Sequence, residues 1–513
     1  PDQLEQMTVW PLTAVGKIDK KKLIARAIAS YDSIKTRAVF DKQQYLEATV
    51  EITSLPNELA MKLASTDIAT DYAIYEHIGE WSIGLDRFAD IFANKKKAWL
   101  SIKDQIIEFN HPRLCDAIQD ATRAIPVDNW RIYGTAKFEM SHVFHGIDIA
   151  NTQTREDEIL HLFVPSSEVR ITEGKARIRV LNSAQLEPLI KLVTELDEIS
   201  ETQNISTDKT AIPIKVDVEN INKSAYQQSV QNAVDEINNH YYQKVILSRR
   251  VPLPTDIDLL ESYRLGRANN TPARSFLLKI SDKKLAGFSP ETVVEVAKDG
   301  WISTQPLAGT RSLGENKEQE LKLKKELLSD TKEIAEHAVS VKLAQEELIP
   351  ICDPESIVVS EFMAVRRRGS VQHLASRVKG KLKKDKTAWD AFESLFPAVT
   401  ASGIPKKAAI EAIHRHEPET RGWYSGCVMI VDSDGSMDAA LVLRSIYQDG
   451  EKIWLQAGAG IVDQSTPERE LEETTEKLSC VSKYLVKKTT CHSLLRQSIN
   501  EEFKENYSEV DNA

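Results

Sequence analysis

Three strand-like segments near the C-terminal end place the strongest constraint on the fold. They are "GCVMIVD" (426–432), "DAALVLRSIYQ" (438–448) and "KIWLQAGAG" (452–460), and the links between them are "DSDGS" and "QDGE". Short links that contain Gly and Asp between apolar runs are typical of β-hairpins, in which neighbouring strands run antiparallel. The sequence therefore predicts that this part of the chain builds an antiparallel sheet.

The remaining elements are spaced unevenly along the chain. Strands are expected at 48–53, 130–140, 244–251, 274–280 and 291–297, and helices at 224–239, 259–268 and 317–348. A further helical stretch is expected around Ile91–Phe109. Strands interleaved irregularly with long helices favour an α+β architecture over a regular βαβ winding.

Composition excludes several classes of function. The net charge is −11, from 77 acidic and 66 basic residues, and this argues against a dedicated nucleic-acid-binding protein. The longest apolar runs are far shorter than the roughly 20 residues that span a bilayer, so no membrane partner is expected. Five scattered cysteines without C-x-x-C spacing indicate neither a disulfide framework nor a zinc cluster. We expect a cytoplasmic protein.

Two acidic helices have the same arrangement of glutamates. In "PERELEETTEKL" (467–478), Glu470, Glu473 and Lys477 stand at i, i+3 and i+7 and share one helix face, beside an apolar stripe. In "SDTKEIAEHAVSV" (329–341), Glu333 and Glu336 repeat the pair beside a second stripe. Both helices begin with residues that favour a helix start.

These two glutamate pairs have two interpretations. If they met across a cleft, four carboxylates would repel one another unless a hard cation held them, and oxygen-only ligation suits Mg²⁺. If they do not meet, each is an ordinary solvated helix face. The residues taken alone leave both interpretations open.

Eight segments in the same order resemble the chorismate-utilising enzymes, the family of isochorismate, salicylate, anthranilate and aminodeoxychorismate synthases. The resemblance covers roughly residues 48–487. The segments are "KVILSRR", "GFSPETVVEV", "TQPLAGTRSLG", "LLSDTKEIAEHAVSV", "FPAVTASGIPKKAA", "RGWYSGCVMIVDSDG", "AALVLRSIY" and "AGAGIVDQSTPERELEETTEKL". The resemblance implies a large α+β fold with two mixed, mainly antiparallel sheets flanked by helices around a deep cleft, in which Mg²⁺ holds chorismate.

The resemblance also implies roles for individual residues. Glu336 and Glu473 are expected as the principal Mg²⁺ ligands, with Glu333 and Glu470 acting beside them through waters. The other residues are expected to bind the substrate, a dicarboxylate that needs cationic and N–H donors. They are Arg444 and Tyr424 as a clamp on one carboxylate, the Gly458-Ala459-Gly460 turn as a backbone cradle, Lys477 as a carboxylate partner, and Gly309, Thr310, His373 and Thr400 as further lining.

Three positions separate the activities within the family. Lys244 stands where anthranilate synthases typically have glutamine, and it marks the members that use water. Ala308 stands where aminodeoxychorismate synthases have a nucleophilic lysine, and "FPAVTASGIPK" resembles the salicylate synthase version of that segment. The expected function is therefore a salicylate synthase, with release of isochorismate as the alternative. A non-catalytic scaffold is a hypothesis of a different class.

The expected chemistry assigns one residue to each proton transfer. Lys244 acts as the general base that activates water for attack on C2 of the chorismate ring, and Glu291 acts as the general acid that protonates the departing C4 hydroxyl. The bound isochorismate then loses pyruvate and becomes salicylate. Glu291 needs a raised pKa for this role, and an apolar neighbourhood could provide it.

The first 45 residues differ from the rest of the chain. "PLTAVGKIDKKKL" resembles the closing motif of adenylation domains in nonribosomal peptide synthetases, with Lys17 matching the lysine that reaches their active site. We expect an extension at 1–45, a catalytic domain at 46–487 and a polar tail at 488–513. The extension is either part of a larger fusion, a docking segment for a synthetase partner, or a basic helix on the surface. A role in siderophore assembly follows from the resemblance.

Overall fold

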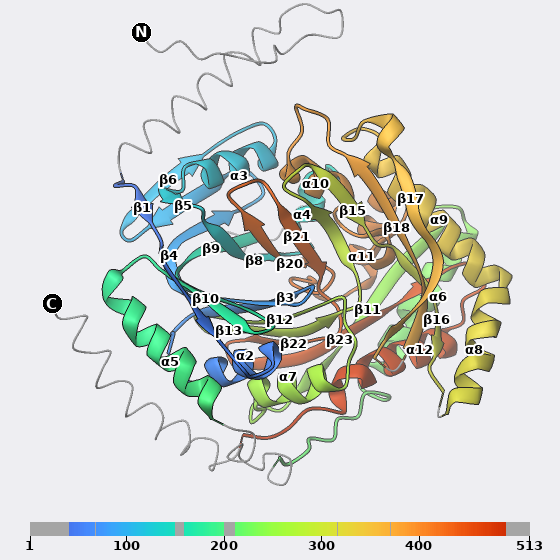
Figure 1. The fold of residues 1–513 in the computed structure, drawn as a ribbon. Coiled ribbons are helices and arrows are strands. Elements are labelled where there is room, and N and C mark those ends of the chain that lie inside the picture. Colours follow the sequence, from blue (N-terminus) through green and yellow to red (C-terminus); the bar gives the residue numbers. More distant parts are fainter. Residues whose placement is uncertain are drawn as a thin grey trace, which may run out of the picture.

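The computed structural model describes residues 40–148, 158–199 and 211–488, apart from residues 67, 315 and 370 (Figure 1). Within these residues, one short parallel pair joins β1 (Gln43–Gln44) to β7 (Val127–Asp128). The other named strands form one closed, hydrogen-bonded network whose pairings are antiparallel (Figure 1). The expected α+β architecture is confirmed, and the two expected sheets are continuous with each other.

The N-terminal part of the network is covered by short helices. Its helices are α2 (Pro56–Ala64), α3 (Leu114–Arg123), α4 (Met140–Phe144) and α5 (Leu186–Glu198). Its strands are β2 (Leu46–Glu51), β3 (Tyr72–His77), β4 (Glu80–Ala93), β5 (Ala98–Ile102), β6 (Gln105–Phe109), β8 (Arg131–Ala136), β9 (Leu160–Thr172) and β10 (Lys175–Val180). The apolar faces of α2 and α5 pack into one core beneath β2, β9 and β10. These faces include Leu59, Leu63, Leu189 and Val193.

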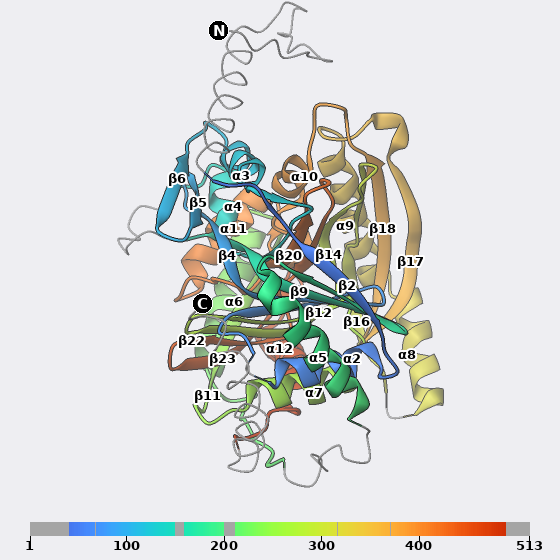
Figure 2. The same ribbon diagram turned by 60° about the vertical axis from the view of Figure 1, so that its left-hand side comes forward.

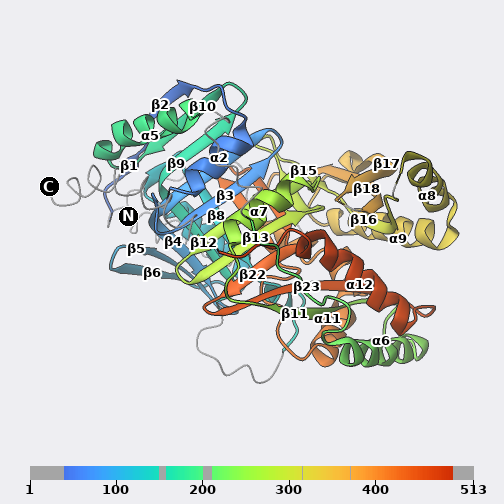
Figure 3. The ribbon, with the colours of Figure 1, turned by 90° about the horizontal axis from the view of Figure 1, so that it is seen from below.

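The C-terminal part contains the longer helices. They are α6 (Lys223–Asn238), α7 (Leu259–Ala268), α8 (Lys317–Ser329), α9 (Thr331–Leu348), α10 (Ala388–Leu395), α11 (Lys406–His416) and α12 (Pro467–Ser482). The strands are β11 (Lys244–Leu253), β12 (Arg274–Ile280), β13 (Lys283–Ser289), β14 (Thr292–Val296), β15 (Trp301–Thr304), β16 (Leu307–Ser312), β17 (Val358–Arg368), β18 (Val371–Lys381), β19 (Gly403–Ile404), β20 (Cys427–Asp432), β21 (Met437–Leu441), β22 (Ser445–Asp449) and β23 (Lys452–Ile461). Figures 2 and 3 show α8 and α9 packed with β17 and β18 at one side of the molecule.

The helix expected around Ile91–Phe109 is wrong. This stretch forms the end of β4, then β5 and β6, which pair with one another. Burial alternates from residue to residue along Ala98–Ile102, which is the period of a strand. The Asn94 side chain accepts hydrogen bonds from the backbone N–H groups of Lys96 and Lys97, and this closes the turn between β4 and β5.

The C-terminal hairpins are confirmed, with one difference in the middle segment. β20 pairs with β21 and β22 pairs with β23, all antiparallel. The run at 438–448 is not one strand but two, since the chain breaks between β21 and β22 at Arg444, which has a φ of +51°. A left-handed conformation costs energy for a residue other than glycine, and such residues gather at functional sites.

Each of the two acidic helices begins at a residue whose side chain caps its N-terminus. The Asp330 side chain accepts from the N–H groups of Lys332 and Glu333, so the helical region at 317–348 is divided into α8 and α9. The Thr466 side chain accepts from the N–H of Arg469 at the start of α12. Helix α9 packs on β16 and β18, and α12 packs on β23. Both lie at the same end of the molecule in Figure 3.

Three expectations from the sequence concern features outside the site. Within the described residues, no helix is long and apolar enough to cross a membrane. Within the described residues, no disulfide forms, and Cys115, Cys352, Cys427 and Cys480 are buried thiols. The adenylation-like motif with Lys17, and almost all of the 488–513 tail, lie outside the described residues.

A buried carboxylate ties three strands of the N-terminal part together. Glu168 on β9 is fully buried and accepts from the Tyr133 hydroxyl at 2.5 Å, Arg179 Nη1 at 2.6 Å and Arg170 Nε at 3.0 Å. Burial raises the pKa of Glu168, but Arg170, Arg131 and Arg179 outweigh this and lower it to about 2. The network therefore depends on an ionised carboxylate.

We expect Glu168→Gln to lower the free energy of unfolding by about 3 kcal/mol at neutral pH, because it removes the buried negative charge that Arg170 and Arg179 contact. Because the folded pKa lies below the ordinary 4.5, the ionised carboxylate contributes stability above that pH and loses it as the pH falls toward 2. Urea unfolding at several pH values measures the difference. Glu173→Gln, at an exposed turn, is the matched control. Equal stability of the two variants would contradict the prediction.

Candidate active site

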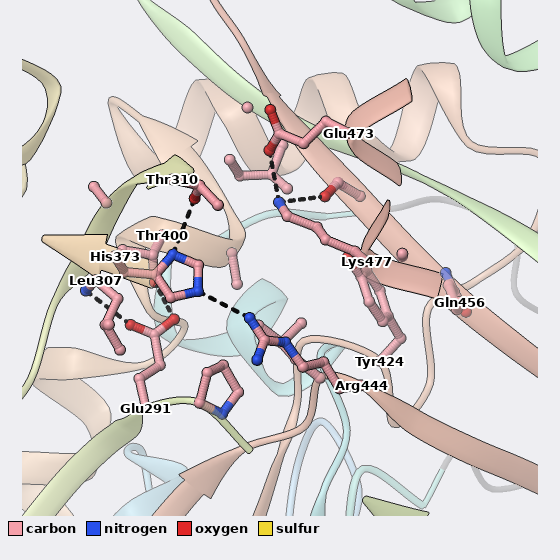
Figure 4. Close-up of a pocket in the computed structure, with 18 of the residues that line it drawn as sticks. Glu291, Leu307, Thr310, His373, Thr400, Tyr424, Arg444, Gln456, Glu473 and Lys477 are labelled. Carbon is pink, nitrogen blue, oxygen red and sulfur yellow. Dashed lines mark hydrogen bonds and ion pairs between the residues drawn. The ribbon is translucent and has the colours of Figure 1, made fainter. Parts of the chain in front are cut away.

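A pocket of about 910 Å³ collects residues from distant parts of the chain (Figure 4). Its walls come from β11, β16, β18, β23, α9, α12 and the loops beside them. It brings together most of the residues expected from the sequence. These are Lys244, Glu291, Gly309, Thr310, Glu336, His373, Thr400, Tyr424, Arg444, Gly458, Gly460, Glu473 and Lys477.

Glu291 is buried at one side of the pocket, with 3% of its surface exposed. The Thr400 hydroxyl donates to its Oε1 at 2.7 Å and the Leu307 N–H donates to its Oε2 at 3.1 Å (Figure 4). Burial raises the pKa of this carboxyl to about 7, although the bond from Thr400 opposes the shift. Near neutral pH, Glu291 can therefore hold a proton and also release it.

Arg444 is fixed by two contacts. Its Nη2 lies 2.9 Å from His373 Nε2 (Figure 4), and its Nη1 donates to the Arg368 carbonyl at 2.7 Å. Since a guanidinium only donates, His373 Nε2 must accept, and its Nδ1–H then donates to the Thr310 hydroxyl at 2.9 Å. Burial, together with Arg444, lowers the pKa of His373 well below its ordinary value, so the imidazole is neutral.

Two lysine–glutamate pairs line the pocket. Lys244 Nζ lies 2.5 Å from Glu336 Oε1. Lys477 Nζ lies 2.7 Å from Glu473 Oε1 and donates to the Gly458 carbonyl at 2.9 Å. Burial raises the pKa of Glu336, but Lys244 outweighs burial and lowers it. The pocket therefore holds ionised groups of both signs.

Three expected residues do not line the pocket. Ala459 lies between two lining glycines on β23, where alternation turns its side chain away, so the expected turn at 458–460 is wrong. A Cβ at Gly458 would approach the Tyr424 hydroxyl and the Leu247 carbonyl to 2.8 Å, so glycine permits their close approach. Glu333 instead accepts from Arg311 Nη1 at 2.7 Å and from the Thr310 N–H at 3.3 Å.

Glu470, the third of these residues, is buried with 3% exposure. Its Oε2 has no hydrogen-bond partner within the described residues. Burial and the neighbouring Glu473 raise the pKa of Glu470 to about 7. A buried carboxylate oxygen without a partner beside a second carboxylate is a position that a cation would satisfy.

Several lining residues were not expected from the sequence. Leu307 supplies a backbone donor to Glu291, and Gln456 stands two residues before Gly458 on the same face of β23. Gln456 could have been found from the period-2 spacing of strands, since it precedes the expected Gly458 by two positions. Leu307 could not, because the register of β16 shifts between Ala308 and Thr310. Ile246 likewise follows the expected Lys244 by two positions on β11, whereas Leu443 and Val481 carry no such signal.

The family model described as chorismate binding enzyme matches residues 70–483, which is most of the chain. The chain belongs to the chorismate binding enzyme family. A salicylate synthase from Mycolicibacterium paratuberculosis is 36% identical over 461 residues, covering 88% of this chain and 98% of that protein. Anthranilate synthase component 1 from Spirochaeta aurantia is 43% identical over 238 residues, covering 46% and 49% of the two chains.

Solved structures support the fold of this chorismate binding enzyme. Anthranilate synthase component I from Streptococcus pneumoniae superposes with a TM-score of 0.64 at 26% identity, covering 79% of this chain and 92% of that one. The isochorismate synthase MenF from Escherichia coli also gives 0.64, at 20% identity, covering 89% and 99%. At 20% identity, this likeness shows the fold alone.

The raised pKa of Glu291 predicts a pH-dependent gain in stability for Glu291→Gln. The folded pKa of about 7 exceeds the ordinary 4.5, so ionising Glu291 costs stability as the pH rises through this window. The free energy of unfolding of the variant minus that of the wild type should therefore increase by up to about 3 kcal/mol between pH 4 and pH 8. Urea unfolding at both pH values tests this. Glu472→Gln, on the exposed side of α12, should show no such trend, and an equal trend in both would contradict the prediction.

Proposed function

We propose that this chain is a Mg²⁺-dependent salicylate synthase, which converts chorismate through isochorismate to salicylate and pyruvate. The observation that carries the proposal is one pocket that holds both a lysine and a buried, proton-retaining carboxyl, Lys244 and Glu291. The similarity to a salicylate synthase over 88% of the chain supports the choice of product.

The acid and the base suit the two proton transfers of the first step. Water attacks C2 of the ring as Lys244 takes its proton, and the C4 hydroxyl leaves as water with a proton from Glu291. The bonds from Thr400 and Leu307 fix the Glu291 carboxyl in one orientation. To act as the base, Lys244 first has to lose the proton of its ammonium group, and with it the ion pair with Glu336. The isochorismate that forms then loses pyruvate in the same pocket.

The cationic groups suit a substrate with two carboxylates. Arg444 is oriented by His373 and the Arg368 carbonyl, so its guanidinium is prepared for a planar carboxylate before the substrate arrives. Tyr424 lines the pocket beside Arg444, and Lys477 lines it from helix α12. A neutral His373 accepts from Arg444 and does not repel it.

The residues present fit a Mg²⁺ ion that is completed by waters and by substrate oxygens. Within the described residues, no three histidine, cysteine or acidic groups form a ready-made cluster. Mg²⁺ usually takes only one or two protein carboxylates, and Glu336 and Glu473 line the pocket from opposite helices. Glu470 and Glu333 would act through waters. The ion would neutralise and polarise the ring carboxylate.

We also propose domain boundaries, a partner and a cellular role for the enzyme. The catalytic domain would span 46–487, and the extension at 1–45 would connect the enzyme to a nonribosomal peptide synthetase, as a fusion or by docking. Salicylate would then serve siderophore assembly in the cytoplasm. These statements rest on the sequence resemblance.

The product assay tests the function directly. Purified protein with chorismate and Mg²⁺ should release salicylate and pyruvate in equal amounts, followed by fluorescence and chromatography. Removal of Mg²⁺ with a chelator should stop turnover, and added Mg²⁺ should restore it. Isochorismate without pyruvate would favour the isochorismate synthase, and anthranilate from added ammonia without salicylate would reject the assignment. Absence of any turnover would favour a scaffold.

Lys244→Gln separates the two steps. We expect the loss of a general base to slow conversion of chorismate by about 10²–10⁴-fold. Supplied isochorismate should still give salicylate and pyruvate, because the second step adds no water. The two rates, measured side by side on the same preparation, control for folding. Equal loss of both reactions would contradict a role confined to water activation.

A further inference from the structure

A second pocket lies behind one wall of the active site. Its volume is about 1020 Å³, and it is lined by α4, by the end of β8 and by the hairpin of β22 and β23. The loop at 420–424 separates the two pockets. Arg421, Gly422 and Trp423 line the second pocket, whereas the next residue, Tyr424, lines the first.

The second pocket is lined by five lysine or arginine side chains and by three acidic ones, Glu139, Glu158 and Asp449. The side chains of Lys95, Lys137 and Lys283 line it and have no hydrogen bond or ion pair within the described part of the chain. By contrast, Arg421 is paired with Glu417 at 2.6 Å, and Arg250 is paired with Glu419. The three lysines are therefore the groups available to an anion.

The same pocket also has buried polar atoms without partners. His142 is 7% exposed, and its Nδ1 has no partner within the described residues. Glu139 Oε1 accepts from the Gly422 N–H at 3.1 Å, but its Oε2 has no partner there. The Trp454 Nε1–H is unpaired as well. Buried polar groups are normally satisfied by protein or by water, and a bound molecule that both donates and accepts hydrogen bonds would satisfy these atoms.

We propose that this second pocket binds a small aromatic carboxylate that carries a hydroxyl or amino group. The carboxylate would face Lys95 and Lys137, the ring would lie against Trp423, and the hydroxyl or amino group would donate to Glu139. Burial and Lys95 lower the pKa of His142 to about 4, so it is neutral and can accept or donate beside them. The inference rests on the proposed function only in taking salicylate as the probe.

Occupancy of the second pocket reaches the active site through Arg421. Its guanidinium lies over the Tyr424 ring at 5.3 Å and over the Phe138 ring at 4.6 Å. It also donates to the Ala401 carbonyl at 2.7 Å, beside Thr400, and to the Ile246 carbonyl at 2.6 Å on the strand that begins with Lys244. A ligand that moves the loop at 420–424 therefore acts on three walls of the first pocket.

The test separates the two pockets with one substitution in the first pocket and two in the second. Arg444→Gln weakens carboxylate binding in the first pocket, and salicylate is titrated into this full-length variant by calorimetry. We expect one site to remain. Adding Lys95→Gln and Lys137→Gln should lower its affinity by about tenfold or more, because two cationic partners are lost. Adding Lys96→Gln instead, an exposed neighbour outside the pocket, should leave the affinity unchanged.

Two results would overturn the second site. One is the absence of salicylate binding once Arg444 is replaced, and the other is equal affinity with and without the Lys95 and Lys137 substitutions. A chain with Lys95→Gln and Lys137→Gln alone should turn over chorismate like the wild type in the absence of added salicylate. The binding result does not depend on turnover, so failure of the second site and failure of the proposed function are distinguishable.

Discussion

The site depends on keeping ionised groups of both signs together in one largely enclosed pocket. Lys244 with Glu336 and Lys477 with Glu473 are pairs in which each charge makes the burial of the other tolerable. Such pairs add little net stability, since apolar residues of the same volume would often do as well. Their presence in a pocket is therefore better explained by binding, because each lysine and each glutamate can exchange its partner for a charged ligand. The strands and helices around the pocket hold these pairs in place.

The same balance explains why Glu291 differs from Glu336. Glu291 has no lysine beside it and is held only by a hydroxyl and a backbone N–H. Desolvation therefore prevails and its pKa rises to about 7, as burial and a neighbouring carboxylate also raise the pKa of Glu470, whereas Lys244 keeps the pKa of Glu336 low. One pocket thus contains an acid that retains its proton and an acid that remains charged, and the difference lies in the neighbours of each carboxyl.

Much of the fold and of the candidate site could be predicted from the sequence, and the predictions that failed did so for physical reasons. The faces of α9 and α12 followed from helical spacing, because residues three and four apart must lie together. Their meeting in one pocket did not follow from spacing, since it depends on how β16, β18 and β23 pack, and there the family resemblance was needed. The helix predicted around Ile91–Phe109 failed because its apolar residues fit two periods, and only the turn at Asn94 decides between them. The pKa of Glu291 depends on burial, which no local pattern reveals.

At Arg444 the backbone departs from the regular strand that the local sequence predicts. The run at 438–448 has the composition of a single strand, and a regular strand would turn alternate side chains to opposite faces. The positive φ of Arg444 interrupts that alternation and brings its guanidinium to His373 and the Arg368 carbonyl. The strain is held because Ser425 N–H donates to the Val442 carbonyl and Phe288 N–H to the Arg444 carbonyl, which fix the chain on either side. The guanidinium that we propose as the carboxylate clamp is thus held in place by a backbone conformation that the sequence pattern disfavours. A local loss of stability of this kind is expected at a binding site.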